Sequence, residues 1–183
     1  MTRLTAINPE QATGKTKELF NAVQGKLGSV PNMMRTMGNS PALLESYLNL
    51  SSTLGSGILG AKTGELIALA VAESNACNYC LSAHSFIGSK LMKIEPEVLA
   101  NARIGNSLNA KTNAILQFAK QIVNKKGLVS DADVTYVKNA GVTEGEIGEI
   151  VGHIAINILT NYFNIVAGTE IDFPVVRAHT STI

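Results

Sequence analysis

Apolar residues recur along this chain at helical spacing, in runs separated by short polar breaks. Start and stop signals flank these runs, such as Asn8-Pro9 before the first run and Gly28 after it. The pattern predicts helices over residues 9–27, 41–54, 66–71, 77–92, 110–124 and 144–166, a short one opening at 96 and another near 131. No segment shows the alternation typical of a strand, so the predicted fold class is all-α.

Two polar breaks have a capping residue followed by an acid three positions later, Ser130 with Asp133 and Thr143 with Glu146. Only the second, with its Glu, fits the standard capping box, and we expect the long C-terminal helix to open there.

The glycines of the 55–60 loop formally satisfy Gly-x-Gly-x-x-Gly. A predicted helix precedes them where a nucleotide site needs a strand, so we expect a helix-to-helix loop.

The longest apolar stretch, residues 147–167, carries polar residues at spacings of four, four, four and three: Glu149, His153, Asn157, Asn161 and Asn164. Such a stripe is typical of a packed helix and not of a bilayer span, so we expect no membrane insertion. With 45% apolar and only 16% charged residues, the chain is hydrophobic for its size. A nearly all-apolar helix in a small protein indicates burial by a partner subunit. We therefore expect a homo-oligomer.

Length and charge narrow the function classes. The 183 residues suit one domain, and no low-complexity linker divides them, so residues 1–183 are predicted to form a single unit. The net charge is +1 and no basic cluster is longer than Lys125-Lys126, which argues against nucleic-acid binding. The first residues lack the apolar core of a signal peptide, which favours the cytoplasm. There a close cysteine pair is more often catalytic or metal-binding than structural.

The candidate chemistry lies in the run Cys77-Asn78-Tyr79-Cys80, with His84 four residues further on. A thiol reacts as its thiolate, and an unperturbed cysteine with a pKa of about 8.5 is mostly protonated near neutrality. Both sulfurs are expected in the first turn of a helix, where unpaired N–H groups stabilise negative charge. His84 lies on the same helical face. A Cys-x-x-Cys pair can also close a disulfide, so the unit could supply nucleophile, resolving thiol and proton-transfer group.

Two acids could orient the histidine or relay its protons: Glu65, twelve residues before Cys77, and Glu73, four before it. Read without wider context, each would more often lie on a solvated face. A zinc site built from the cysteines, His84 and one of these acids is an alternative, as are inert buried thiols. Structural zinc sites commonly take a second ligand pair from elsewhere, and the chain has no other cysteine.

The spaced set Glu65, Cys77, Cys80 and His84 resembles the proton-relay and dithiol motif of the alkylhydroperoxidase D group, within the carboxymuconolactone decarboxylase-like superfamily. Residues 30–32 and 40–41 resemble the segment upstream of that motif. Residues 161–164 and 169–174 resemble the C-terminal end of the peroxidase-related branch. The resemblance covers about residues 30–174, which we take as the core of the domain.

The resemblance implies a compact helical bundle that assembles as a homotrimer or homohexamer and needs no cofactor. Cys80 would attack a hydroperoxide to give a sulfenic acid, Cys77 would resolve it as a disulfide, and an external dithiol would donate electrons. Glu65 and His84 would form the proton relay, with Tyr79 and Glu73 beside them. The best-known members have a histidine where this chain has Tyr79, and a tyrosine cannot act as a base near neutral pH.

Two other functions compete with this hypothesis. A non-enzymatic redox sensor or partner-binding protein would use the disulfide to change an interface. Lactone decarboxylation, the activity of the founding enzymes, does not depend on a Cys-x-x-Cys pair. Other conspicuous residues have structural interpretations. His153 is expected to be a satisfied structural histidine or to form an interface hydrogen bond, and His179 to be part of a mobile tail. Three methionines are expected to fill the core or an interface: Met33, Met34 and Met37.

Overall fold

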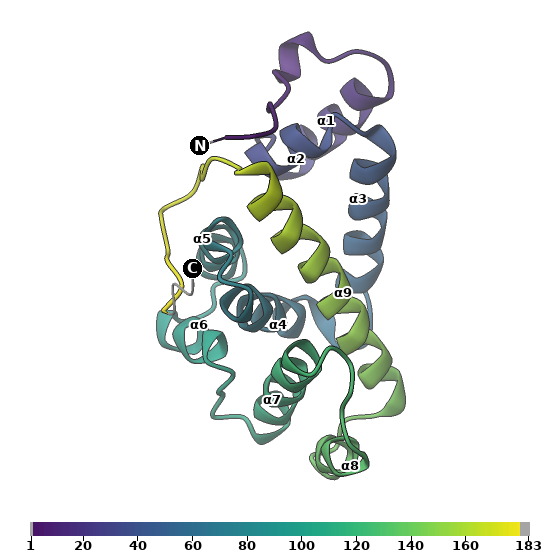
Figure 1. The fold of residues 1–183 in the computed structure, drawn as a ribbon, viewed down its shortest axis with the longest axis vertical. Helices are drawn as coiled ribbons and strands as arrows, with labels where there is room; N and C mark the ends of the chain where they lie inside the picture. Colours follow the sequence, from purple (N-terminus) through teal and green to yellow (C-terminus); the bar gives the residue numbers. More distant parts are fainter. Residues whose placement is uncertain (1, 180–183) are drawn as a thin grey trace.

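A computed structural model describes residues 2–179 of the chain (Figure 1). Within these residues there are helices and no strand, which confirms the predicted all-α class. In chain order the elements are the 3₁₀ turn η1 (Pro9–Gln11), α1 (Gly14–Leu27), α2 (Asn32–Met37), α3 (Pro41–Gly55), α4 (Gly60–Ser74), α5 (Asn78–Phe86), the π-helical segment η2 (Ile87–Leu91), α6 (Pro96–Arg103), α7 (Ala110–Asn124), α8 (Asp131–Asn139) and α9 (Glu144–Ala167).

Helix α4 is the centre of the bundle, and α5, α6, α7 and α9 pack around it (Figure 1). Its residues from Gly64 to Ala72 are all buried, including both faces of the apolar run. A helix that is apolar all round is stable only when neighbours cover every side. The central position of α4 follows from that composition, and it places Glu65 inside the protein.

The N-terminal region differs from the prediction of one helix over residues 9–27. Asn8 caps only the short η1 turn, and the chain is extended at Ala12 and Thr13 before α1 begins at Gly14. Ala12 is buried, so packing of this residue interrupts the helix that the local signals favour. Helix α2, which the sequence pattern did not predict, contains the three methionines, and all three are buried as expected.

The capping prediction for the last two helices is half right. Thr143 and Glu146 form a reciprocal capping box at the start of α9, as expected. Ser130 and Asp133 form the same reciprocal arrangement at the start of α8. The restriction to Glu was therefore wrong here, because the shorter Asp side chain also reaches the N-cap backbone N–H, at 2.8 Å.

The glycine-rich loop between α3 and α4 is a helix-to-helix connection, as predicted. The backbone N–H groups of Ile58 and Leu59 each donate to the carboxylate of Glu149 at 2.9 Å. These bonds hold the pKa of Glu149 below its usual range. The N–H groups that a phosphate would use already bind an anion of the protein itself.

The polar stripe of α9 faces inward, and its outer face is apolar. Asn157, Asn161 and Asn164 are buried, whereas Val151, Leu159 and other apolar residues are exposed. Within the part of the chain that the structure describes, α9 is the one helix long and apolar enough to cross a membrane by length and composition. Half of its most apolar window is buried in the protein.

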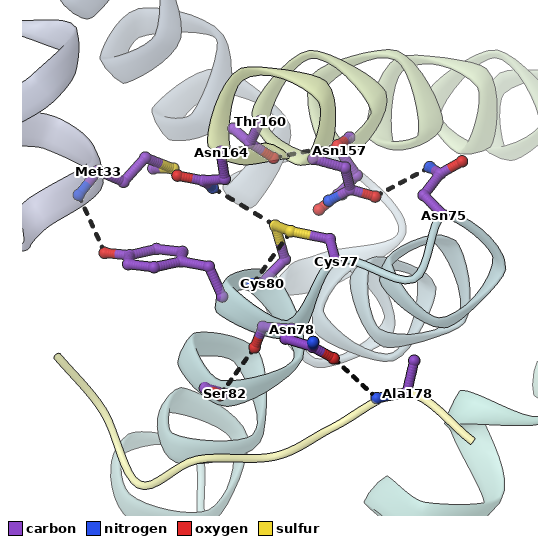
Figure 2. Close-up of a disulfide and its surroundings, with 12 residues drawn as sticks. Met33, Asn75, Cys77, Asn78, Cys80, Ser82, Asn157, Thr160, Asn164 and Ala178 are labelled. Atoms are coloured by element: carbon purple, nitrogen blue, oxygen red, sulfur yellow. Dashed lines mark hydrogen bonds between the residues drawn. A yellow bond between two sulfur atoms is a disulfide. The ribbon is translucent and has the colours of Figure 1, made fainter. Parts of the chain in front are cut away.

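The C-terminal segment, residues 169–179, lies across the outer side of α5, and we call it the strap (Figures 1 and 2). The backbone N–H of Val176 donates to Ser82 Oγ, and that of Ala178 donates to Asn78 Oδ1, both at 2.9 Å. At its end, the N–H of His179 donates to Glu73 Oε1 at 2.6 Å. The expectation of a mobile tail at His179 was therefore wrong, because Glu73 binds it.

Candidate functional site

The turn between α4 and α5 positions the first cysteine. Ala76 adopts a left-handed conformation (φ 51°), the N–H of Cys77 donates to Ala72 O at 3.0 Å, and that of Ala76 donates to Glu73 O at 3.1 Å. This is the Schellman pattern that ends a helix. Because the turn is so short, Cys77 both closes α4 and serves as the N-cap of α5.

Cys77 and Cys80 are joined as a disulfide, with a Cα–Cα distance of 5.3 Å that is ordinary for such a bond (Figure 2). The backbone N–H of Cys80 donates to Cys77 Sγ at 3.3 Å, in the manner of a side-chain cap. Both sulfurs thus lie in the first turn of α5, where the sequence predicted them.

A cavity of about 400 Å³ lies beside the disulfide. Cys80 lines this cavity and Cys77 does not. The walls are mostly apolar and come from α2, α3, α4, α5, η2, α9 and the strap, among them Met33, Met34, Tyr47, Leu54, Phe86, Ile156 and Phe173. The two sulfurs are therefore inequivalent: one faces a space that can hold a small organic molecule, and the other is covered.

Glu65 and His84 meet at the wall of the same cavity. His84 Nδ1 lies 2.9 Å from Glu65 Oε1, and the Glu65 side chain is only 9% exposed. Burial by itself would lower the pKa of His84, but the charge of Glu65 and the hydrogen bonds that His84 makes with Glu65 and Asn157 outweigh it and raise that pKa. The raised pKa favours the protonated imidazolium, so the pair is suited to hold a proton close to Cys80.

The structure does not bring Glu73 to the cavity. Its carboxylate accepts a hydrogen bond from Arg103 Nε at 2.8 Å and another from the end of the strap. Burial would raise the pKa of Glu73, yet the bonds from His179 and Arg103 together lower it. Of the two candidate acids, Glu65 is thus the one that reaches the histidine, and Glu73 fastens the strap to α4.

Tyr79 is buried between the cavity and the strap. Its hydroxyl accepts a hydrogen bond from the N–H of Met33 at 3.0 Å, and its ring meets that of Phe173 edge-on with centroids 5.8 Å apart. Burial, with the charge of Asp172 nearby, raises the pKa of Tyr79 far above its usual range. The side chain stays neutral and ties α5 to α2.

The polar stripe of α9 forms the wall opposite the cysteines (Figure 2). Asn164 Nδ2 donates to Cys80 Sγ at 3.4 Å. Asn161 Oδ1 accepts a hydrogen bond of 2.9 Å from Asn75, in the turn before Cys77. Asn157 is beside His84 and donates to His153 O at 2.8 Å. The polar stripe in the sequence predicted a packed helix but not that these residues lie at the site. The signal was available: amides at regular spacing on a nearly apolar helix need buried partners.

His153 also lines the cavity, and its ring packs against Gly64 of α4. Burial lowers its pKa, so the ring is neutral near pH 7. Its Nε2 is buried and has no hydrogen-bond partner among the described residues, so the histidine is structural but not fully satisfied. In the same part of the chain no three Cys, His, Asp or Glu side chains converge as a metal-binding group.

Residues 41–88 match the model of the carboxymuconolactone decarboxylase family. This segment spans α3 to α5 and contains Glu65, both cysteines and His84. Over these residues the chain resembles the carboxymuconolactone decarboxylase family, in agreement with the resemblance that the spaced motif indicated. An uncharacterized protein of Haemophilus influenzae is 48% identical over 46 residues, which are 25% of this chain and 41% of that protein.

Solved structures with the same fold cover nearly the whole chain. An uncharacterized peroxidase-related protein with an alkylhydroperoxidase AhpD core, from Ralstonia eutropha, has a TM-score of 0.83 at 23% identity, over 93% of this chain and 92% of its own. A peroxidase-related protein from a Silicibacter species has a TM-score of 0.79 at 23% identity, over 93% and 94%. The debrominase Bmp8, as a cysteine-to-alanine variant with 2,3,4-tribromopyrrole, has 0.78 at 21% identity, over 94% and 92%. At these identities the likeness establishes the fold.

Proposed function

We propose that the protein is a cofactor-free dithiol oxidoreductase that reduces hydroperoxides. The observation that carries this proposal is the asymmetry of the disulfide: Cys80 faces the cavity together with the Glu65–His84 pair, and Cys77 does not. An attacking thiol must meet substrate, whereas a resolving thiol needs only to reach the attacking sulfur.

The reaction would proceed in two steps. The Cys80 thiolate attacks the terminal oxygen of R–O–O–H, the O–O bond breaks, and the departing alkoxide takes a proton from the His84 imidazolium. Cys80 is then a sulfenic acid. The Cys77 thiolate attacks its sulfur, the S–O bond breaks as the disulfide forms, and the departing hydroxide takes up the proton that the Cys77 thiol released and leaves as water. An external dithiol would reduce the disulfide and complete the cycle.

Cys77 and Cys80 have surroundings that fit these separate roles. The capping N–H of Cys80 stabilises negative charge on Cys77 Sγ, which is what a resolving thiolate needs. The imidazolium of His84, paired with Glu65, is a proton donor on the cavity side, where the alkoxide would leave.

Mixing the reduced protein with cumene hydroperoxide tests the proposal. We expect both thiols to disappear from titration. In a Cys80→Ser variant Cys77 should remain reduced, and a Cys77→Ser variant should accumulate a sulfenic acid on Cys80. Two titratable thiols after prolonged exposure would overturn the peroxidase assignment. Identical assembly of the oxidised and reduced protein in light scattering would argue against the redox-sensor alternative.

Reductive dehalogenation is a second candidate, because the cavity is mostly apolar and large enough for a halogenated ring. In that reaction a carbon–bromine bond would be replaced by carbon–hydrogen, with both cysteines oxidised to the disulfide and bromide and a proton released. Bromide release from tribromopyrrole by the reduced protein, stoichiometric with disulfide, would favour it over peroxide reduction. Release of carbon dioxide from a carboxymuconolactone, unaffected by thiol alkylation, would instead favour the decarboxylase alternative.

A further inference from the structure

The cavity beside Cys80 has no permanent cation on its walls. Among the described residues that line it, none is Lys or Arg, and the titratable groups besides Cys80 are Glu65, His84, Tyr47, Tyr79 and His153. The positive charge of His84 is balanced by Glu65 at 2.9 Å. A thiolate at Cys80 therefore depends on hydrogen bonds, since a buried charge without them is strongly unfavourable.

The backbone donor in the first turn of α5 is not directed at Cys80 Sγ. The N–H of Cys80 donates to Cys77 Sγ. The donor at Cys80 Sγ is the side chain of Asn164, on the facing helix α9, with Nδ2 at 3.4 Å (Figure 2). Asn164 is 4% exposed, so this amide is largely shielded from bulk solvent. A hydrogen bond to the charged form of a group favours that form.

The other end of the same amide has no partner. Asn164 Oδ1 is buried and accepts no hydrogen bond from the described residues. In Figure 2 this oxygen points away from the disulfide, on the side of Met33, and both residues line the cavity. Buried acceptors are nearly always satisfied, so this one indicates a ligand that brings a hydrogen-bond donor.

We propose that Asn164 is a catalytic residue, whose amide N–H stabilises the Cys80 thiolate and whose amide oxygen accepts the O–H of the hydroperoxide. This inference rests on the proposed function. The oxygen that sulfur attacks carries that hydrogen, so a hydrogen bond from it to Oδ1 would hold the attacked oxygen beside Sγ. The new S–O bond forms as the O–O bond breaks, sulfur loses two electrons, and the sulfenic acid keeps the same O–H. The proton for the alkoxide comes from His84.

The thiolate role is tested by titrating Cys80 through thiolate absorbance in a Cys77→Ser background. We expect Asn164→Leu to raise the pKa of Cys80 by about 1 pH unit. At a pH below that pKa, the thiolate fraction would then be about tenfold smaller than in the parent. Asn164→Asp should raise it further, since a carboxylate replaces the donor. Thr160→Val, on the same cavity wall and bonded to Asn157 O, should leave it unchanged. An unshifted pKa in folded Asn164→Leu and Asn164→Asp would overturn the proposal.

The role of the amide oxygen is tested at a pH above the thiol pKa of both proteins, where each is fully thiolate. There we expect cumene hydroperoxide to oxidise the Asn164→Leu protein at least about tenfold more slowly than its parent, since loss of one oriented hydrogen bond commonly has that effect. Equal limiting rates would overturn this role. If the parent reacts with no hydroperoxide while the pKa shift persists, the proposed function fails and the thiolate role stands.

Discussion

Cys77 and Cys80 share one helical turn but have different surroundings. Cys77 Sγ accepts a backbone N–H and is covered, whereas Cys80 Sγ accepts an amide N–H and faces the cavity. The acid–histidine pair is on the cavity side only. At the scale of single residues, the site is therefore organised for reaction at Cys80 and resolution by Cys77.

Replacement of the relay acid, Glu65→Gln, should slow peroxide reduction and change its pH dependence. Burial lowers the pKa of His84, and the charge of Glu65 normally outweighs that effect. Without this carboxylate the pKa of His84 should therefore fall. We expect the rate near pH 7.5 to drop at least about tenfold and the alkaline limb of the pH–rate profile to move to lower pH. Initial rates of hydroperoxide consumption from pH 5 to 10 would measure both effects.

Glu73→Gln is the matched control, since Glu73 lies on the same helix but binds Arg103 and His179 outside the cavity. Its pH–rate profile should follow that of the parent protein. A profile altered as strongly as that of Glu65→Gln would show that the relay runs through the other acid.

The Glu65–His84 pair should also make stability depend on pH. Because the folded-state pKa of His84 is raised, its stabilising effect is complete below the unfolded value of about 6.5 and is lost as pH rises through the folded value. We expect the difference in free energy of unfolding between the parent and His84→Gln to shrink over that interval. Urea denaturation of the disulfide forms at several pH values measures it, and a difference that grows with pH would contradict the assignment.

At the scale of elements, the strap supports the cysteine helix from the side opposite α9. Its backbone binds Asn78 and Ser82 of α5, and Phe173 packs against Tyr79 and Phe86, at centroid distances of 5.8 and 5.6 Å. Helix α5 is thus held between two elements that are far from it in sequence. The strap also supplies Phe173 to the cavity wall.

Phe173→Ala should loosen the strap and lower the free energy of unfolding by about 1–3 kcal/mol, because two aromatic contacts and part of a buried ring are lost. Hydrogen exchange should quicken at Val176 and Ala178, whose N–H groups bind α5. Val175→Ala is the control, since Val175 is 57% exposed. Equal exchange in the two variants would mean that the aromatic contacts do not hold the strap.

At the scale of the whole molecule, the main feature is that α9 buries its polar side chains and exposes its apolar ones. Its amides face the site, and from residue 151 to 166 its exposed positions carry no charge: Val151, Ala155, Leu159, Tyr162, Ile165 and Val166. A continuous apolar face on one helix is typical of an interface. We therefore propose that copies of the chain associate through the outer face of α9, as a trimer or hexamer.

Leu159→Lys should reduce the molar mass measured by light scattering at micromolar concentration, because a charge placed in an apolar interface is desolvated without a partner. Leu128→Lys is the control, an equally drastic change at a residue that is 84% exposed in the loop between α7 and α8. A monomeric parent protein, or the same mass for both variants, would contradict an interface on α9.

Local sequence signals were enough to predict the helical class, most helix positions and the unit from Cys77 to His84. These features depend on residues a few positions apart, through periodicity, capping and helical spacing. The same local signals were misleading at Ala12, where burial interrupts a helix, and at Asp133, where a shorter acid also closes a capping box.

Which acid meets His84, and which residues surround Cys80, depends on how the helices pack against one another. The rotation of α4 about its axis, set by packing against four helices, turns Glu65 to the cavity and Glu73 to Arg103. Asn164 reaches Cys80 across 84 residues of chain because α9 folds back along α5. Local spacing cannot specify such contacts, since they arise where helices that are distant in sequence bury one another's polar groups.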